Sequence, residues 1–201
     1  MSDDAGSAAA MTGGAPSLGP LIYAIHGRTP QVEGAAFLAP GAVLIGGVTL
    51  GEGTSVWYGC VLRADGGTIT VGRDVNIQDG SILHADPGFP AVLGDRVSLG
   101  HGAIVHGATV EDDVLIGMRA TVLNGAVIGA GSLVAAGALV RPGTIVPPGS
   151  LVAGVPAQVR RPVTDEDTEM IRRTSPSYLK HAADHRAALE EHRAAGGRVS
   201  P

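Results

Sequence analysis

The sequence has few aromatic residues, a single cysteine and no long hydrophobic run. Aromatic side chains make up only 3% of its 201 residues, although 44% of the residues are hydrophobic. Large aromatic rings supply much of the buried volume in an ordinary globular core. Their scarcity therefore argues against such a core and favours a narrow, repetitive core built from Val, Leu, Ile and Ala.

The lone cysteine, Cys60, excludes a disulfide within the chain, which is typical of a protein from a reducing cytoplasm. The N-terminal segment carries acidic rather than basic residues, and its apolar run at residues 8–10 is too short for a signal peptide. No run approaches the ~18 apolar residues of a membrane helix. We therefore expect a cytoplasmic protein without membrane contact, whose residues 1–20 form a disordered leader of small residues.

The charge distribution argues against nucleic-acid binding. The formal net charge is -5, and the 14 lysine and arginine residues are scattered along the sequence. A protein that binds a phosphate backbone needs a clustered basic surface. We therefore expect a small-molecule substrate and no nucleic-acid partner.

Aliphatic residues recur every six positions over most of the chain. This period fits neither the 3.6-residue repeat of a helix nor the two-residue alternation of a sheet. It is the signature of a parallel β-helix, in which three hexads make one triangular coil and successive coils stack at about 4.8 Å. The series comprises Leu38, Leu44, Leu50, Val56, Leu62, Val71, Ile77, Leu83, Leu93, Leu99, Val105, Val110, Ile116, Val122, Ile128, Val134, Val140, Val146 and Val152.

Three irregular steps interrupt this repeat. The step lengthens to nine residues at 62–71, which inserts three residues near positions 64–68, and to ten residues at 83–93, which inserts four within positions 84–90. It shortens to five residues at 105–110. Register breaks in a solenoid form protruding loops or redirect side chains, often on the binding face.

A helical tail follows the last hexad. Thr164 is the expected N-cap because three acidic residues occupy the first turn after it. We expect Ser175 and Pro176 to end this helix and to begin a second one. The predicted organisation is a leader (residues 1–20), a β-helix domain (21–160), a C-terminal helical segment (161–195) and a frayed tail (196–201).

Three of the seven histidines lie close to the register breaks. When three hexads are counted for each coil, Arg63, His84 and His106 each follow an aliphatic residue of the same face, so they form one column. Histidines one coil apart can chelate a single ion through bonds of about 2.1 Å. We therefore expect His84 and His106 to share a metal ion.

The third histidine belongs to another column. Asp79 and His101 stack on a neighbouring face, with Gln78 beside them. His101 cannot readily join the first column within one chain. Parallel packing of three solenoids about a three-fold axis would bring one subunit's first column against its neighbour's second column, and cyclic symmetry closes this contact.

Several short motifs surround these residues: VLRAD (residues 61–65), NIQD (76–79), His84, GH (100–101), VHG (105–107) and GVPA (154–157). With these motifs the sequence resembles the gamma-class carbonic anhydrases, over roughly residues 34–189. The resemblance implies a left-handed β-helix and a homotrimer. It also implies Zn²⁺ or Fe²⁺ held by three histidines, two from one subunit and one from its neighbour, with His84, His101 and His106 as ligands.

The activity that the resemblance implies is reversible hydration of CO₂ to bicarbonate by a metal-bound hydroxide, a lyase reaction. Gln78 would orient the hydroxide or the substrate, and Asp79 would fix the tautomer of a histidine through a hydrogen bond. Arg63 and Asp65 would form an ion pair between subunits that lines the site. The implied catalytic set is therefore Gln78, Asp79, Arg63 and Asp65.

The sequence departs from the best-studied members of that family, which use acidic residues to export protons. Gly66 follows Asp65 where those proteins carry an acid, and Asp86 is the only carboxylate of a short loop after His84. The position of Asp86 does not match the family's proton-exporting acid. This departure leaves two further hypotheses open: a hexapeptide-repeat thioesterase or acyltransferase acting on CoA esters, and a catalytically silent trimeric accessory protein.

Overall fold

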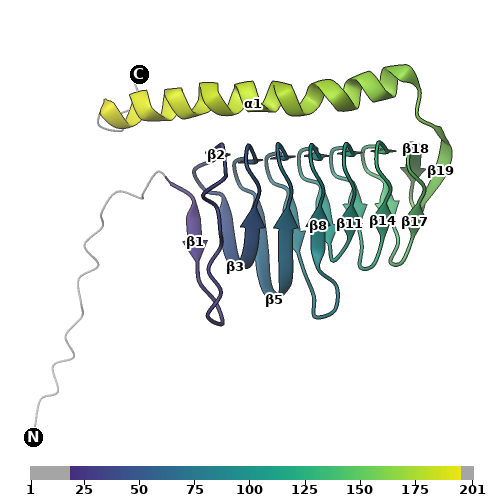
Figure 1. Cartoon of the computed structure of the whole chain (residues 1–201), viewed down its shortest axis with the longest axis horizontal. Coiled ribbons are helices and arrows are strands. Elements are labelled where there is room, and N and C mark those ends of the chain that lie inside the picture. The colour runs from purple at the N-terminus through teal and green to yellow at the C-terminus, as the bar shows by residue number, and fades with distance from the viewer. Residues whose placement is uncertain (1–18, 196–201) are drawn as a thin grey trace, which may run out of the picture.

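The computed structural model describes residues 19–195, so nearly all of the predicted leader and the whole predicted frayed tail lie outside the described residues. These residues form a parallel β-solenoid of about seven turns and a single long C-terminal helix, which confirms the predicted fold class. The coils stack in a row, and helix α1 runs along one side of that row (Figure 1).

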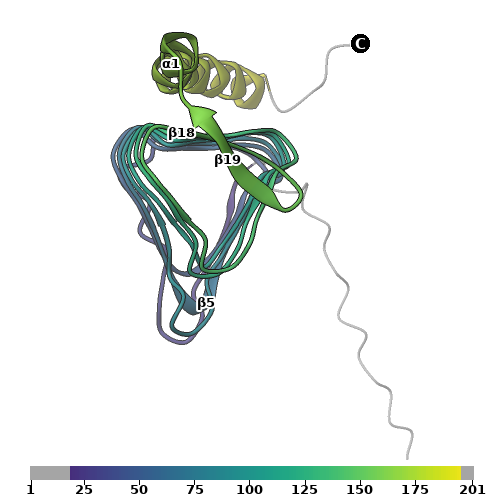
Figure 2. The same cartoon turned by 90° about the vertical axis from the view of Figure 1, so that its right-hand side faces the viewer.

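Each coil is a triangle, and Figure 2 shows the three faces end-on. The first two faces form one 11-stranded sheet, because the long strands β3 and β5 bend around the corner between these faces. The first face contains β1 (Leu21–Tyr23), β3 (Val43–Leu50), β5 (Val61–Val71), β7 (Ile82–His84), β10 (Ile104–His106), β13 (Thr121–Val122) and β16 (Leu139–Val140).

The second face continues β3 and β5 and adds β8 (Ala91–Leu93), β11 (Thr109–Val110), β14 (Val127–Ile128) and β17 (Ile145–Val146). The third face is a separate 8-stranded sheet. Its strands are β2 (Phe37–Leu38), β4 (Ser55–Val56), β6 (Asn76–Ile77), β9 (Ser98–Leu99), β12 (Leu115–Ile116), β15 (Leu133–Val134), β18 (Ser150–Gly154) and β19 (Ala157–Pro162). Strand β19, which the hexad pattern did not predict, pairs antiparallel with β18 at the C-terminal end.

The predicted register is confirmed at the interrupted coils. Leu62 pairs with Leu83, Leu83 pairs with Val105, and Ile77 pairs with Leu99. The aliphatic series lines the interior, where every member except the half-buried Leu38 is at most 5% exposed. The insertions therefore bulge outward and leave the stacking of the core intact.

The glycines that follow the aliphatic residues allow the coils to stack closely at the corners. A Cβ atom added to Gly51 would lie 2.5 Å from the carbonyl oxygen of Gly72, and one added to Gly72 would lie 2.6 Å from that of Gly94. Both distances are too short for any side chain. Glycine recurs here because the backbones of successive coils approach one another directly.

Helix α1 (Asp165–Ala194) begins as predicted but does not break where predicted. Thr164 caps it in a capping box with Asp167. The expected break at Ser175 and Pro176 was wrong, because the helix continues through Pro176. Proline removes only one backbone hydrogen bond here, and packing holds the helix: the Ser175 hydroxyl donates to the Asp74 carbonyl at 2.7 Å, and Tyr178 packs edge-on against Trp57.

Candidate metal centre

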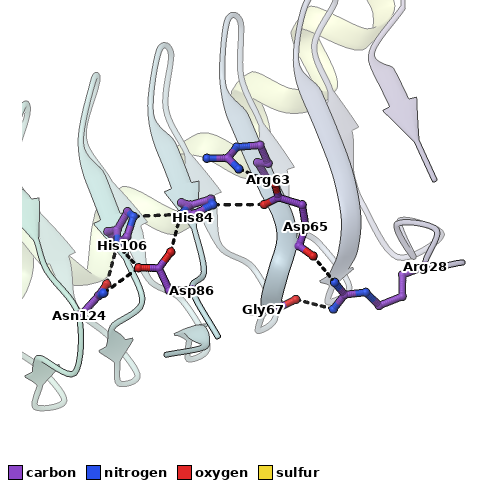
Figure 3. A network of polar contacts seen from close by, with 8 residues as sticks. All are labelled: Arg28, Arg63, Asp65, Gly67, His84, Asp86, His106 and Asn124. Atoms are coloured by element: carbon purple, nitrogen blue, oxygen red, sulfur yellow. Dashed lines mark hydrogen bonds and ion pairs between the residues drawn. The ribbon is translucent and has the colours of Figure 1, made fainter. Parts of the chain in front are cut away.

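The first column lies at the corner between the first and second faces. Backbone pairing sets Arg63 beside His84 and His84 beside His106, each one coil from the next. The Nδ1 atom of His84 lies 2.9 Å from the Nε2 atom of His106 (Figure 3). Two imidazole nitrogens from adjacent coils therefore converge on one point.

The outer ring nitrogens of both histidines face hydrogen-bond acceptors. His84 Nε2 lies 3.3 Å from a carboxylate oxygen of Asp65, and His106 Nδ1 lies 2.5 Å from the amide oxygen of Asn124. An ionised carboxylate and an amide oxygen only accept hydrogen bonds, so in a neutral ring each of these acceptors favours the proton on the outer nitrogen. The two inner nitrogens then present lone pairs to each other, an arrangement that fits a bound cation.

Asp86 lies beside both histidines, a position that the hexad register did not predict. Its carboxylate oxygens are 3.6 Å from His84 Nδ1 and 3.8 Å from His106 Nδ1, and it accepts a hydrogen bond of 2.9 Å from the Asn124 amide. A tight turn that pairs Asp86 with Phe89 directs the short loop back over the column. One ligand atom from each of His84, Asp86 and His106 lies within 4.8 Å of the others, a group able to hold a metal ion.

The ion pair of Arg63 and Asp65, expected between subunits, forms here within one chain at 2.6 Å. Residues two apart on a strand point to the same side, so β5 itself brings the two side chains together. The Arg63 guanidinium, with a smaller contribution from the hydrogen bond to His84, lowers the pKa of the Asp65 carboxyl to about 2. Asp65 therefore stays ionised at neutral pH.

Arg28, which is not among the predicted site residues, holds the β5 corner in place. Its guanidinium donates to the carbonyl oxygens of Asp65 and Gly67, both at 2.6 Å (Figure 3). No motif marks this arginine, because it precedes the regular hexads and contacts backbone rather than side chains.

The second column lies at the corner between the third and first faces. His101 Nδ1 is 2.9 Å from a carboxylate oxygen of Asp79, and both side chains are almost half exposed. Because Asp79 accepts the proton on Nδ1, the Nε2 atom of His101 is free to bind a ligand. Gln78 is buried beside this column, and its amide donates to the Asn76 side chain at 3.0 Å rather than reaching His84.

The two columns lie at opposite ends of the first face. His101 lies in the turn before β10 and His106 ends that strand, so the strand separates the two histidines. Within residues 19–195, the group of ligand atoms around His84 accordingly does not include His101. The His101 corner borders a pocket of about 410 Å³ lined by Trp57, Tyr58, Asp79, His101, Tyr178, His181 and His185.

Comparisons with known proteins agree with this architecture. Residues 107–142 match a bacterial transferase hexapeptide family (six repeats), and residues 90–118 match a hexapeptide repeat of succinyl-transferase. A probable carbonic anhydrase from Methanocaldococcus jannaschii is 47% identical over 143 residues, which cover 71% of this chain and 90% of the archaeal protein. The chain belongs to the gamma carbonic anhydrase family.

Some members of the family are longer than this chain. It is 44% identical to the mitochondrial gamma carbonic anhydrase 1 of Arabidopsis thaliana and spans 62% of that protein's length, while 81% of this chain is covered. Among solved structures, a putative acetyltransferase from Bacillus cereus superposes with a TM-score of 0.81 at 34% identity, covering 85% of this chain and 99% of its own. Among residues 19–195, no helix is both long and apolar enough to cross a membrane.

Proposed function

We propose that the protein is a metal-dependent carbonic anhydrase that reversibly hydrates CO₂ to bicarbonate at sites shared between the subunits of a homotrimer. The observation that carries this proposal is the 2.9 Å approach of His84 Nδ1 to His106 Nε2, with an acceptor on the far side of each ring. The identity to gamma carbonic anhydrases supports the reaction.

The proposed ligands are His84 and His106 of one subunit and His101 of its neighbour. Three imidazoles are the donor set of catalytic zinc sites, so these residues would hold the ion and leave it able to bind water. The hydrogen bond from His101 Nδ1 to Asp79 supports this assignment, since it frees the Nε2 atom for coordination. Zn²⁺ is the proposed ion, and Fe²⁺ suits the same imidazole ligands.

The shape of the protomer supports the shared site. The two columns terminate the same face, so a head-to-tail contact repeated about a three-fold axis would bring each first column to a neighbour's second column. Ile82, two residues before His84 on the same side of β7, is 40% exposed despite its apolar side chain. Burial of Ile82 at a subunit interface would remove this apolar surface from water.

When bound, the cation would supply Lewis-acid chemistry, which lowers the pKa of a water molecule towards about 7. The side chains around it keep the site ready for that ion. Asp65 holds the proton of His84 on Nε2, and Asp79 holds that of His101 on Nδ1. Gln78 is the proposed substrate-orienting residue, and Asn76 fixes its amide plane by accepting one N–H.

The experiment that tests this proposal is a stopped-flow assay of CO₂ hydration after anaerobic purification, with metal analysis of the zinc and iron forms. We expect stoichiometric metal and hydration in at least one form. Stoichiometric metal with no hydration in either form would contradict the proposal and favour the silent accessory protein.

The likeness to a putative acetyltransferase favours acyl transfer or thioester hydrolysis as the second candidate. An assay of acetyl-CoA hydrolysis in the same preparations, which measures the released thiol, tests this candidate. Thiol release that disappears in His106→Ala, without CO₂ hydration in the parent protein, would establish the thioesterase instead.

A further inference from the structure

We propose that Asn124 is a positioning residue of the metal centre: Asp86 fixes the orientation of the Asn124 amide, and this amide fixes the tautomer of His106. This inference rests on the proposed metal centre, because it concerns how that centre is prepared for its ion. It assigns a role to a carboxylate and an amide that the hexad register did not connect to the histidines.

The contacts form a continuous chain across adjacent coils (Figure 3). The Nδ2 atom of Asn124 donates to Asp86 at 2.9 Å, and the Oδ1 atom of Asn124 lies 2.5 Å from His106 Nδ1. The next contact is the 2.9 Å approach of His106 Nε2 to His84 Nδ1. We call Asp86, Asn124 and His106 the relay. It links the Asp86 carboxylate, through the Asn124 amide and the His106 imidazole, to the point where the ion would bind.

The direction of each hydrogen bond follows from the carboxylate. An ionised carboxylate has no proton to donate, so the end of the amide that faces Asp86 must be the N–H₂ group. The amide oxygen then faces His106, which places the proton of the neutral ring on Nδ1. The Nε2 atom of His106 is left with the lone pair that a metal ion requires.

Without the charge on Asp86 this order is no longer imposed. The amide of Asn124 can then turn over and donate its N–H₂ group to His106 Nδ1, which moves the ring proton to Nε2. A proton on Nε2 occupies the position between His106 and His84 and must leave before an ion binds. Asp86 thus acts on the metal centre through Asn124.

The glycine at position 107 leaves room for the contacts of the relay. A Cβ atom added to Gly107 would lie 2.5 Å from the Asn124 amide oxygen and 2.7 Å from the Phe89 Cβ atom, so a side chain at this position would displace both the amide and the loop of Asp86. Asn124 itself is anchored on the coil that follows, because its carbonyl oxygen accepts from the Gly143 N–H at 2.9 Å. Glycine at position 107 therefore leaves the space that the relay occupies.

The test compares Asp86→Asn with the exchanged double variant Asp86→Asn/Asn124→Asp. The exchange keeps the same groups and net charge, since Asn at position 86 can donate to Asp at position 124, which accepts from His106 Nδ1. Asp113→Asn is the matched control, because it neutralises a half-exposed aspartate that pairs with Arg96 far from the column. The readouts are ¹⁵N spectra of the histidine rings in zinc-free protein and the zinc affinity in a chelator competition.

In the parent protein we expect the ring proton of His106 on Nδ1. Asp86→Asn should move this proton towards Nε2. It should also weaken zinc binding by about 10–100-fold, the usual effect of losing a residue that supports a metal ligand through hydrogen bonds. The double variant should restore both readouts, and Asp113→Asn should change neither.

Two results would overturn the inference. One is an unchanged His106 tautomer and zinc affinity in Asp86→Asn. The other is a loss that the double variant does not restore, which would make Asp86 itself a metal ligand. Because the tautomer is measured without metal or substrate, a parent protein with the expected tautomer and bound zinc but no CO₂ hydration would contradict only the proposed function.

Discussion

His84 and His106 are 22 positions apart in the sequence, yet Nδ1 of the first lies 2.9 Å from Nε2 of the second. Their ring centroids are 4.8 Å apart, which is the spacing of neighbouring strands. The pair is thus a direct product of in-register stacking in the solenoid. The chemistry of the proposed site follows from what lies at the outer edge of each ring.

Replacing His106 by alanine should abolish zinc binding and CO₂ hydration without unfolding the solenoid. Loss of a residue that is hydrogen-bonded to a metal ligand lowers metal affinity by about 10–100-fold. Loss of the ligand itself should therefore lower it by at least about 100-fold. His106 is half-buried on the outer side of β10, so the core should be unaffected. Isothermal titration with zinc measures the loss, and His192→Ala, near the end of α1, is the matched control.

Removing the metal should lower the stability of the assembled trimer more than the stability of a single subunit. A ligand present at 100 times its dissociation constant stabilises the state that binds it by about 2.7 kcal/mol. If the ion is shared between subunits, chelation with EDTA should lower the Tm and make it depend on protein concentration. A Tm that falls equally at all protein concentrations would indicate an ion held within one chain.

The start of α1 should lose stability in acid. The Arg161 guanidinium, followed by the Thr164 backbone N–H, holds the pKa of Asp167 well below its ordinary value. A carboxyl whose pKa is lower in the folded state contributes stability above its unfolded pKa of about 3.9, and this is lost as the pH falls towards the folded value. Urea unfolding between pH 7 and 2 should therefore show a steeper acid loss in the parent protein than in Asp167→Asn.

The cap of α1 offers a separate prediction at neutral pH. The Thr164 hydroxyl accepts from the Asp167 N–H at 3.2 Å, and the Asp167 carboxylate accepts from the Thr164 N–H at 2.8 Å. Thr164→Ala should lower the free energy of unfolding by about 1 kcal/mol. Thr168→Ala, one turn further along the helix, should have a smaller effect. Equal losses in the two variants would contradict the role of the cap.

The sequence predicted those features that depend only on register. The hexad repeat predicted the stacking of Arg63, His84 and His106, and it predicted Asp79 beneath His101. It also explains why the single cysteine is buried, since Cys60 occupies a small-residue position of the core. Such positions are set by a backbone that repeats from coil to coil.

Features outside the repeat could not be predicted in the same way. The approach of Asp86 to the histidines depends on the turn that pairs it with Phe89, and the contact with Asn124 depends on the room left at Gly107. The continuity of α1 through Pro176 depends on packing against the third face, such as the contact of Tyr178 with Trp57. Loop geometry and tertiary contacts have no period, so they cannot be predicted from the hexad register.

The most direct test of the shared metal centre is complementation between two inactive chains. Neither His101→Ala nor His106→Ala should bind zinc or hydrate CO₂ alone. In mixed trimers, a His101→Ala subunit keeps His84 and His106, and an adjacent His106→Ala subunit supplies His101. Random co-assembly in equal amounts should therefore restore about one quarter of the sites, measured as bound zinc and CO₂ hydration. Co-expressed chains that form trimers but recover neither zinc nor activity would contradict a site built between subunits.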